Sequence, residues 1–323
     1  MRIDVHTHLV YLDFIQHLHG RSSLPNAVKN GGTYVVSCSP GFRAERPPHH
    51  FDVEVKLKDM EEMGVELSVL SHGIPGPELL EPAAADDWAA RINDHLAGVV
   101  ERYPDKFIAW GSIGFGSSER SIAEVDRCIH QLGFKGIQLF SNIRQTALDS
   151  TEFVPVYKHI ASLGVPMNMH PTAPLNLVGM DKPSMVADMG FIYDTSLATA
   201  RLIIAGVFDA IPDLQLIVPH VGGILPYLSG RLERMIGVAS EGPHRLAHPP
   251  SSYLEKLYVD TVAHSVEALK YCFHMLGAER LLYGTDHPFE NYIEIAGMVE
   301  QLECSEADRQ LIYHGNAERL LGL

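Results

Sequence analysis

The sequence predicts an α/β fold, a TIM (β/α)8 barrel in which residues 1–323 form a single domain. Eight short runs of β-forming residues alternate with amphipathic segments of helical length. Several runs are apolar on both faces, as strands are when helices cover them outside and side chains fill the interior. Barrels of this kind occupy about 250 residues or more as one unit, and their right-handed crossovers close the parallel sheet. A doubly wound open sheet is the alternative fold.

Each expected strand is a short run rich in β-branched, aromatic or other apolar residues. In order along the chain, the eight runs are Ile3–His8, Glu66–Ser71, Phe107–Ile113, Gly136–Phe140, Val165–His170, Leu214–His220, Leu257–Val262 and Leu281–Asp286. Apolar residues at helical spacing fill the segments between them, for example in Asp52–Met63 and Trp88–Arg102. Gly64 follows the first of these segments and Pro104 the second, and both residues are typical helix-ending signals.

The longest segment without either pattern extends from about residue 10 to residue 50 and is rich in glycine and proline. Because long connections in a compact domain tend to be functional, we expect a loop or small flap, inserted after the first strand and covering the barrel mouth. Its aromatic residues could form apolar walls for a substrate, Tyr34 among them. The alternative is a surface excursion that packs on itself.

The overall composition argues against several classes of protein. There are 25 Lys and Arg against 40 Asp and Glu, a net charge of −15, which disfavours binding to the phosphates of nucleic acid. No run approaches the roughly 18 apolar residues of a membrane-spanning helix, and no secretory leader is evident before the first strand. The four cysteines lie far apart without a CxxC pair. We therefore expect a cytoplasmic protein with reduced thiols and no membrane partner.

The first expected strand ends in His6-Thr7-His8. Alternation along a strand points both imidazoles the same way, which suits the binding of one metal ion. Such a pair is often accidental by itself, because 18 histidines make chance pairs common; His17-Leu18-His19 in loop-like sequence is an example. A metal site therefore needs support from other polar residues.

Polar residues also stand at the ends of three other expected strands: His170 at the fifth, His220 at the sixth and Asp286 at the eighth. In a barrel the carboxyl ends of the strands meet on one face, so these side chains should lie near the first histidine pair. Three histidines and a carboxylate suit a first-row divalent metal with positions left open for water or substrate. The expected ion is Zn²⁺ or another such metal, for example Mn²⁺, and its expected ligands are His6, His8, His170 and Asp286.

The two remaining roles concern proton transfer. His220 precedes Val221-Gly222-Gly223, whose small residues let a substrate approach, so we expect general acid/base catalysis there rather than metal binding. Asp286 could also accept a proton from a metal-bound water, whose pKa the metal lowers toward about 7. Alternatively, Asp286 caps a helix before Phe289 and His220 is a structural histidine.

The sequence has no GxxxxGK[ST] phosphate loop, GxSxG elbow or HExxH motif.

Taken together, these motifs resemble the amidohydrolase-related family that includes aminocarboxymuconate semialdehyde decarboxylase. The resemblance extends over nearly the whole chain. It rests on Ile3-Asp4-Val5-His6-Thr7-His8, Asp52–Met63 with Gly64-Val65, Gly133-Phe134-Lys135-Gly136-Ile137-Gln138, Pro212–Gly223, Gly284-Thr285-Asp286-His287-Pro288-Phe289 and Gly315-Asn316-Ala317-Glu318-Arg319-Leu320-Leu321.

The resemblance implies roles for individual residues. His220 would activate the metal-bound water, and Phe289, in the shared motif around Asp286, is a candidate substrate contact. In the decarboxylase, an arginine eleven residues beyond the catalytic histidine reaches a substrate carboxylate across a dimer interface, and Arg231 has the matching position here. We therefore expect a homodimer or higher homo-oligomer, although a surface salt bridge would also explain Arg231. The implied ligands of a zinc-like metal are His6, His8, His170 and Asp286.

The sequence departs from the decarboxylase where the substrate would be recognised. The decarboxylase has an arginine in a Phe-Arg-Val-Val stretch, whereas this chain has Thr33-Tyr34-Val35-Val36, and a tyrosine cannot replace a guanidinium group on a carboxylate. The tryptophan-rich insertion of the decarboxylase has no counterpart in Pro171–Met189. Aminocarboxymuconate semialdehyde itself is therefore not the expected substrate.

The expected activity is non-oxidative decarboxylation, or a related C–C bond lysis, of a small carboxylated aromatic compound or ring-cleavage product. Hydrolysis of an amide, ester or lactone at the same metal site is the first alternative, and hydration of an unsaturated diacid is another. A barrel that binds ligands without catalysis is the alternative from a different class. The presence of all five expected polar residues counts against that last reading.

Overall fold

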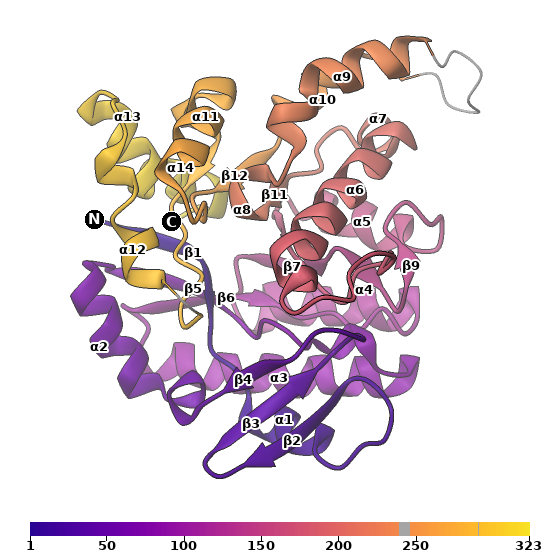
Figure 1. Cartoon of the computed structure of the whole chain (residues 1–323), viewed down its shortest axis with the longest axis vertical. Helices are drawn as coiled ribbons and strands as arrows, with labels where there is room; N and C mark the ends of the chain where they lie inside the picture. The colour runs from indigo at the N-terminus through magenta and orange to yellow at the C-terminus, as the bar shows by residue number, and fades with distance from the viewer. Residues whose placement is uncertain (239–245, 290) are drawn as a thin grey trace.

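The computed structural model describes residues 1–323 except 239–245 and 290. Its centre is an eight-stranded parallel sheet (Figure 1). In spatial order the strands are β1 (Ile3–His8), β5 (Leu67–Ser71), β6 (Phe107–Gly111), β7 (Gly136–Phe140), β10 (Met167–His170), β11 (Leu216–Val218), β12 (Tyr258–Asp260) and β13 (Leu281–Leu282). A parallel bridge between Thr7 and His287 joins the segment after β13 to β1. The sheet is thereby nearly closed, which confirms the predicted (β/α)8 barrel.

Helices follow the strands and cover the outside of the barrel (Figure 1). The α-helices are α1 (Leu12–Leu18), α2 (Val53–Met63), α3 (Pro82–Arg102), α4 (Ser118–Asp126), α5 (Val154–Ser162), α6 (Phe191–Ile204), α7 (Val207–Ala210), α8 (Pro219–Gly222), α9 (Leu225–Val238), α10 (Pro250–Leu254), α11 (Val266–Leu276), α12 (Tyr292–Ala296), α13 (Glu306–Gln310) and α14 (Asn316–Leu321). Short 3-10 or π turns are η1 (Pro48–Phe51), η2 (Pro77–Leu79), η3 (Arg127–Gln131), η4 (Val186–Gly190), η5 (Ala278–Arg280), η6 (Val299–Gln301) and η7 (Leu311–Gly315), and a hairpin pairs β8 (Asn142–Ile143) with β9 (Thr146–Ala147).

The bounds of α2 follow from local sequence. The Asp52 side chain accepts hydrogen bonds from the backbone N–H groups of Glu54 and Val55, which satisfies donors that the first turn leaves open. Gly64 ends the helix in the left-handed conformation, with φ 65°. The helix predicted over Asp52–Met63 is therefore present, with Asp52 as its cap.

Four strands are shorter at their carboxyl ends than the sequence predicts. β6 ends at Gly111 instead of Ile113, and β12 ends at Asp260 instead of Val262. β11 ends at Val218 instead of His220, and β13 ends at Leu282 instead of Asp286. The backbone leaves the extended conformation there, since His220 has φ 55° and Asp286 has φ 62°. Both polar side chains are thus presented by the turns that follow the strands, not by the strands themselves.

The segment from residue 10 to residue 50, which we call the flap, has regular secondary structure, where the sequence predicts a loop or small flap. After α1 it forms an antiparallel sheet of β2 (Asn26–Asn30), β3 (Thr33–Ser37) and β4 (Ala44–Arg46). Gly31, with φ 59°, and Gly32 make the two-residue turn between β2 and β3. Two glycines between alternating strand residues therefore mark a hairpin here, although the glycine and proline content alone suggested irregular structure.

A small hydrophobic cluster fills the inside of the barrel. It draws residues from six of the eight strands, and α14 covers it at the end where the strands begin. Because only the interior is shared by strands on all sides of a barrel, these residues must pack around its axis. This interior cluster consists of Ile3, Val5, Val69, Trp110, Ile217, Tyr258, Leu282, Ala317, Leu320 and Leu321.

Strand β1 has one more residue than its neighbour β5 over the same length. Asp4 pairs with Ser68 and Thr7 pairs with Leu70, so three steps along β1 face two along β5. Such a bulge changes which side chains point to a given face of a sheet. Before the bulge β1 contributes Ile3 and Val5 to the interior cluster, and after it β1 presents histidines at the barrel mouth.

Two further sequence expectations can be compared with the structure. Within the described residues, no helix has both the length and the apolar character needed to span a membrane. None of the four cysteines is in a disulfide. The cytoplasmic location stays a prediction.

Candidate metal centre

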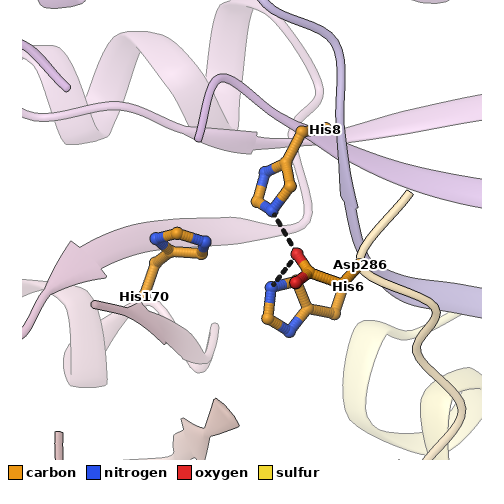
Figure 2. Close-up of side chains that lie close together, drawn as sticks. All are labelled: His6, His8, His170 and Asp286. Carbon is orange, nitrogen blue, oxygen red and sulfur yellow. Dashed lines mark hydrogen bonds and ion pairs between the residues drawn. The ribbon is translucent and has the colours of Figure 1, made fainter. Parts of the chain in front are cut away.

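Four side chains from distant parts of the sequence meet at the mouth of the barrel (Figure 2). His6 and His8 belong to β1, His170 ends β10, and Asp286 follows β13. One possible ligand atom from each lies within 4.8 Å of the other three. The histidines are buried and the carboxylate is partly exposed to the mouth. The structure therefore brings together the four residues that the sequence selected, and we call them the HHHD cluster.

The outer ring nitrogens of two histidines are held by protein acceptors. His6 Nδ1 donates to Asp260 Oδ2 at 2.5 Å, and His170 Nδ1 donates to the Pro171 carbonyl at 2.8 Å. A proton on Nδ1 leaves Nε2 as the nitrogen that faces the other members of the cluster. Hydrogen bonds of this kind fix the tautomer and the orientation of histidines that bind metals.

His8 is held in the same way by a hydroxyl group. The Ser71 hydroxyl donates to the Thr7 carbonyl at 3.1 Å, so its oxygen accepts the hydrogen bond from His8 Nδ1 at 2.7 Å. Nε2 of His8 then faces Asp286, with 3.1 Å between Nε2 and Oδ1. All three imidazoles thus direct Nε2 toward one point, which is the arrangement that a nitrogen-rich metal site requires.

Asp286 contacts several positive or polarisable groups. Its Oδ1 atom is 3.2 Å from His6 Nε2 and 3.1 Å from His8 Nε2. Burial by itself opposes ionisation, but the charge of His6 and the polar contacts with His220, His6 and His8 hold the pKa of Asp286 well below its usual range. The carboxylate is therefore ionised and able to bind a cation at neutral pH.

The three histidines differ in charge in the absence of metal. Burial lowers the pKa of His6, but Asp260 and Asp286 outweigh burial and raise it to about 10. Burial lowers the pKa of His8 to about 4 and that of His170 well below its usual value. The metal-free cluster thus keeps a proton on His6, which a metal ion would displace on binding.

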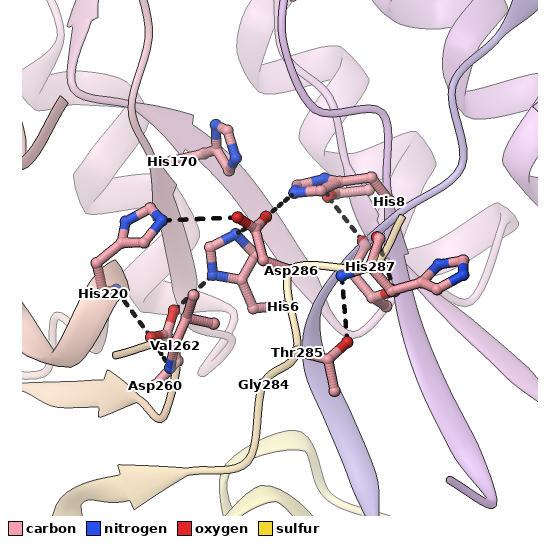
Figure 3. Close-up of polar contacts among 12 residues, drawn as sticks. His6, His8, His170, His220, Asp260, Val262, Gly284, Thr285, Asp286 and His287 are labelled. Atoms are coloured by element: carbon pink, nitrogen blue, oxygen red, sulfur yellow. Dashed lines mark hydrogen bonds and ion pairs between the residues drawn. The ribbon is translucent and has the colours of Figure 1, made fainter. Parts of the chain in front are cut away.

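His220 stands next to the HHHD cluster (Figure 3). Its ring centroid is 5.3 Å from that of His6, and its Nε2 atom is 3.9 Å from Asp286 Oδ2. The left-handed backbone of His220 is held by a hydrogen bond from its N–H to Asp260 Oδ1 at 2.8 Å. Gly223 completes the turn with φ 62°, and a Cβ atom there would lie 2.2 Å from Ser196 Oγ. The turn requires glycine, and it places the imidazole beside the cluster.

Asp260 is a site residue that sequence reasoning missed. One carboxylate oxygen accepts from His6, and the other accepts from the backbone N–H groups of His220 and Val262, at 2.8 Å and 3.0 Å. It is fully buried at the end of β12. A carboxylate inside the apolar run Leu257–Val262 was the available signal, because a buried charge needs a partner.

The three residues predicted to contact the substrate lie in three different parts of the structure. The Phe289 ring centroid is 5.1 Å from that of His8, so Phe289 borders the cluster. Tyr34 is buried in the flap, where its ring packs against His19 and Phe51. Arg231 is exposed on α9, which extends away from the barrel (Figure 1). Substrate contact thus has geometric support for Phe289, and for the other two it stays a prediction.

Further buried polar residues that the sequence analysis did not select lie on the flap and on the segment after β5. Burial lowers the pKa of His50 and of His72 to about 3, so both imidazoles are neutral. Burial raises the pKa of Glu78 to about 8, and one of its carboxyl oxygens accepts from the Thr172 hydroxyl at 2.6 Å. Arg46, at the end of β4, is 1% exposed. The mouth is therefore lined by polar groups from several segments.

The fold and the HHHD cluster define a (β/α)8 barrel of the amidohydrolase type. The family model described as amidohydrolase matches residues 3–323, and the chain belongs to that family. It is 30% identical to the 2-amino-3-carboxymuconate-6-semialdehyde decarboxylase of Dictyostelium discoideum, over 100% of this chain and 92% of the relative. It is 29% identical to the gamma-resorcylate decarboxylase of Polaromonas sp. strain JS666, over 83% of this chain and 86% of the relative.

A solved structure shares the same architecture. The dihydroxybenzoic acid decarboxylase of Polaromonas sp. JS666, with bound manganese and the inhibitor 2-nitroresorcinol, aligns with a TM-score of 0.82 and 25% identity. The alignment covers 100% of this chain and 97% of that chain. The family resemblance seen in the sequence motifs is thereby confirmed.

Proposed function

We propose that this enzyme catalyses the metal-dependent, non-oxidative decarboxylation of a small carboxylated aromatic compound or ring-cleavage product. The observation that carries the proposal is the position of His220, whose Nε2 atom lies 3.9 Å from Asp286 at the edge of the HHHD cluster. A proton donor next to a cation site is what the replacement of a carboxyl group by hydrogen requires. Decarboxylases among the relatives and neighbours, matched over most of the chain, support the same reaction.

The donor set of the cluster fits a divalent first-row metal. Nε2 of His6 is buried and faces Asp286 Oδ1 at 3.2 Å, so an imidazole nitrogen and a carboxylate oxygen point toward the same position, as the ligands of a cation do. The ion would be held by His6, His8, His170 and Asp286 and would polarise a substrate oxygen as a Lewis acid. Three nitrogens favour zinc, whereas the related Polaromonas structure contains manganese. Elemental analysis of the purified protein tests the choice between zinc and manganese.

The residues of the chain account for the proton that the reaction needs. When the bond between the substrate carbon and its carboxyl group breaks, CO2 leaves and the electron pair stays on the carbon. His220 Nε2 would give its proton to this carbon, which forms the new C–H bond. Asp260 orients His220 by accepting from its backbone N–H, and Asp286 faces the imidazole from the other side. The proton on Nε2 is then restored from solvent.

A panel of substrates separates decarboxylation from the alternatives. The manganese-loaded and zinc-loaded enzymes would be given 2,6-dihydroxybenzoate, 5-carboxyvanillate, muconate semialdehydes, lactones and anilides. We expect CO2 release in equal amount to product for at least one carboxylated compound. Hydrolysis or hydration without CO2 release would replace the proposal by one of the alternatives, and no turnover of any compound would favour a binding barrel.

The role of His220 is tested by His220→Asn, which cannot transfer a proton. We expect kcat to fall by about 10²- to 10⁴-fold with unchanged metal content. His274→Asn, on the exposed side of α11, is the matched control and should keep full activity. Full turnover by His220→Asn would eliminate the proposed proton transfer.

The oligomeric state and the location complete the proposal. We propose a homodimer in which Arg231 on α9 reaches the substrate of the neighbouring subunit. Arg231 is exposed and lies outside the mouth of the subunit to which it belongs. Full activity in a demonstrably monomeric preparation would refute this assembly. A cytoplasmic location agrees with four cysteines outside disulfides.

A further inference from the structure

A buried polar network joins α2 to the segment after β13. Its central member is His287, which directly follows Asp286 and is 1% exposed. Lys56 Nζ donates to His287 Nδ1 at 3.0 Å, and His287 Nε2 donates to Asp59 Oδ2 at 2.9 Å. Because an ammonium group can only donate, Nδ1 of the ring accepts, and the ring proton lies on Nε2. Both ring nitrogens are thus held by α2, and we call Lys56 and Asp59 the His287 clamp.

The clamp is itself fixed in place. Lys56 and Asp59 are three residues apart on α2 and so lie on the same face of the helix. The Tyr292 hydroxyl donates to Asp59 Oδ2 at 3.1 Å, and Lys56 Nζ also donates to Thr7 Oγ1, in the middle of the histidine pair of β1. Burial lowers the pKa of Lys56 to about 8, so its ammonium group keeps the charge at neutral pH. One helix is therefore tied to both segments that supply the first and last members of the HHHD cluster.

Asp286 has a backbone conformation that needs such support. Its φ of 62° lies in the left-handed region, which costs energy for a residue with a side chain and persists only where the surroundings hold it. On the preceding side, Thr285 Oγ1 donates to Asp4 Oδ2 at 2.6 Å, and the Thr285 N–H donates to Asp4 Oδ1 at 3.2 Å. The His287 N–H donates to Thr285 Oγ1 at 3.2 Å (Figure 3). Asp286 is thus fixed from both flanks, by Asp4 before it and by the clamp after it.

Packing alone does not explain a charged clamp. α2 already packs on the barrel through the buried side chains of Met60 and Met63. Buried ions are costly to desolvate, and apolar residues of similar volume often replace them without loss of stability. Lys56 is nevertheless 1% exposed and Asp59 is only partly exposed. The charges therefore point to a role in orientation rather than in stability.

We propose that Lys56 and Asp59 are positioning residues, which hold the ring of His287 and thereby keep the Asp286 carboxylate directed at the metal position. Both act through His287 and the backbone of Asp286. The inference rests on the metal centre of the proposed function. It makes the affinity for the metal depend on a helix that lies outside the barrel sheet.

Manganese binding to the metal-free protein tests the proposal without any substrate. Lys56→Met keeps most of the aliphatic chain and removes the ammonium group. We expect its Kd for Mn²⁺ to rise by about 10- to 100-fold, as for other partners of metal ligands. The signal of free Mn²⁺ in electron paramagnetic resonance gives the Kd. Lys58→Met, at an exposed position of the same helix, is the matched control and should keep the wild-type Kd.

A double-mutant cycle separates the positioning of Asp286 from a general structural role. In Asp286→Ala the carboxylate that the clamp positions is absent, so adding Lys56→Met should change the Kd for Mn²⁺ by less than about 2-fold. Asp59→Ala removes the other half of the clamp at a partly exposed position, and it decides the question if Lys56→Met does not fold. It should also weaken Mn²⁺ only when Asp286 is present. Glu62→Ala, exposed on the same helix, is its control.

Two results would overturn the inference. An unchanged Kd for Mn²⁺ in the folded clamp variants, even with a lowered Tm, would show that the clamp only ties α2 to the barrel. An undiminished loss in the Asp286→Ala background would show that the clamp acts through other ligands. Both results leave the proposed decarboxylation standing, because CO2 release by the wild type tests it separately. The expected cycle in an enzyme that releases no CO2 would keep this inference and remove the proposed reaction, whereas a wild type that binds no divalent metal would remove both.

Discussion

The two ends of the barrel interior differ in polarity, although the same strands form both. At the end where the strands begin, the interior cluster is apolar, and its one indole N–H is satisfied, since Trp110 Nε1 donates to the Val5 carbonyl at 2.9 Å. At the mouth, buried polar atoms lack hydrogen-bond partners among the described residues, among them Nε of Arg46 and Oε2 of Glu78. One end therefore stabilises the fold, and the other keeps binding capacity that costs stability.

Strand β1 contributes to both ends within six residues. Ile3 and Val5 pack into the interior cluster, whereas His6 and His8 face the metal site, and the bulge between Asp4 and Thr7 lies at the change. The comparison teaches that stability and function are separated along the barrel axis, as expected for a fold whose loops at one face carry the chemistry. Changes at one end should therefore leave the other largely intact.

The largest expected effect is on stability, from Trp110→Ala in the interior cluster. Trp110 is completely buried, and truncation of such a residue costs about 3–5 kcal/mol of unfolding free energy because a cavity remains. Urea unfolding of the metal-free protein measures the loss. Trp110→Phe keeps most of the volume and should lose less. Metal stoichiometry of the folded fraction should stay at the wild-type value in both variants, and its loss would contradict the separation of the two ends.

A smaller effect is expected at the mouth, from Asp260→Asn. The amide can still accept from the His220 N–H, but its NH2 group would face the proton on His6 Nδ1. Loss of such a partner of a metal-binding histidine lowers metal affinity by about 10- to 100-fold. Competition with a chelator gives the affinity. Asp86→Asn, which removes a buried carboxylate that accepts from Gly116 at the mouth without touching the cluster, is the control. Equal losses in the two variants would refute a specific role of Asp260.

The smallest expected effect is the change in the free energy of unfolding for each unit of pH. Glu78 has its pKa raised by burial from 4.5 to about 8, so between these values the folded state keeps a proton that the unfolded state has lost. The contribution of Glu78 to stability is thus complete below about pH 4.5 and is lost as the pH rises to about 8. Relative to Glu78→Gln, the wild type should lose up to about 1.4 kcal/mol per pH unit over this range. Parallel urea midpoints for the two proteins from pH 5 to pH 8 would contradict the assignment.

The predicted metal ligands at the mouth could be found from the sequence, whereas the residues around them could not. The spacing of His6 and His8 and the polar residues His170 and Asp286 at strand ends were visible because a parallel barrel gathers those ends on one face. The role of Asp260 was not visible in the sequence, since its partner His6 is 254 residues away. The pair forms only when β12 and β1 lie near each other in the closed barrel. Arg46 lay in a segment that composition suggested was irregular.

The sequence by itself determined the order of the eight barrel strands, the membership of the HHHD cluster and the family, because periodicity and motif spacing are local properties of the chain. Only the tertiary structure decided the bulge in β1, the partners of the histidine Nδ1 atoms, the turns that carry His220 and Asp286, and the place of Arg46 beside Phe289. These features depend on contacts between residues that are far apart in sequence. Such contacts exist only after the barrel has closed.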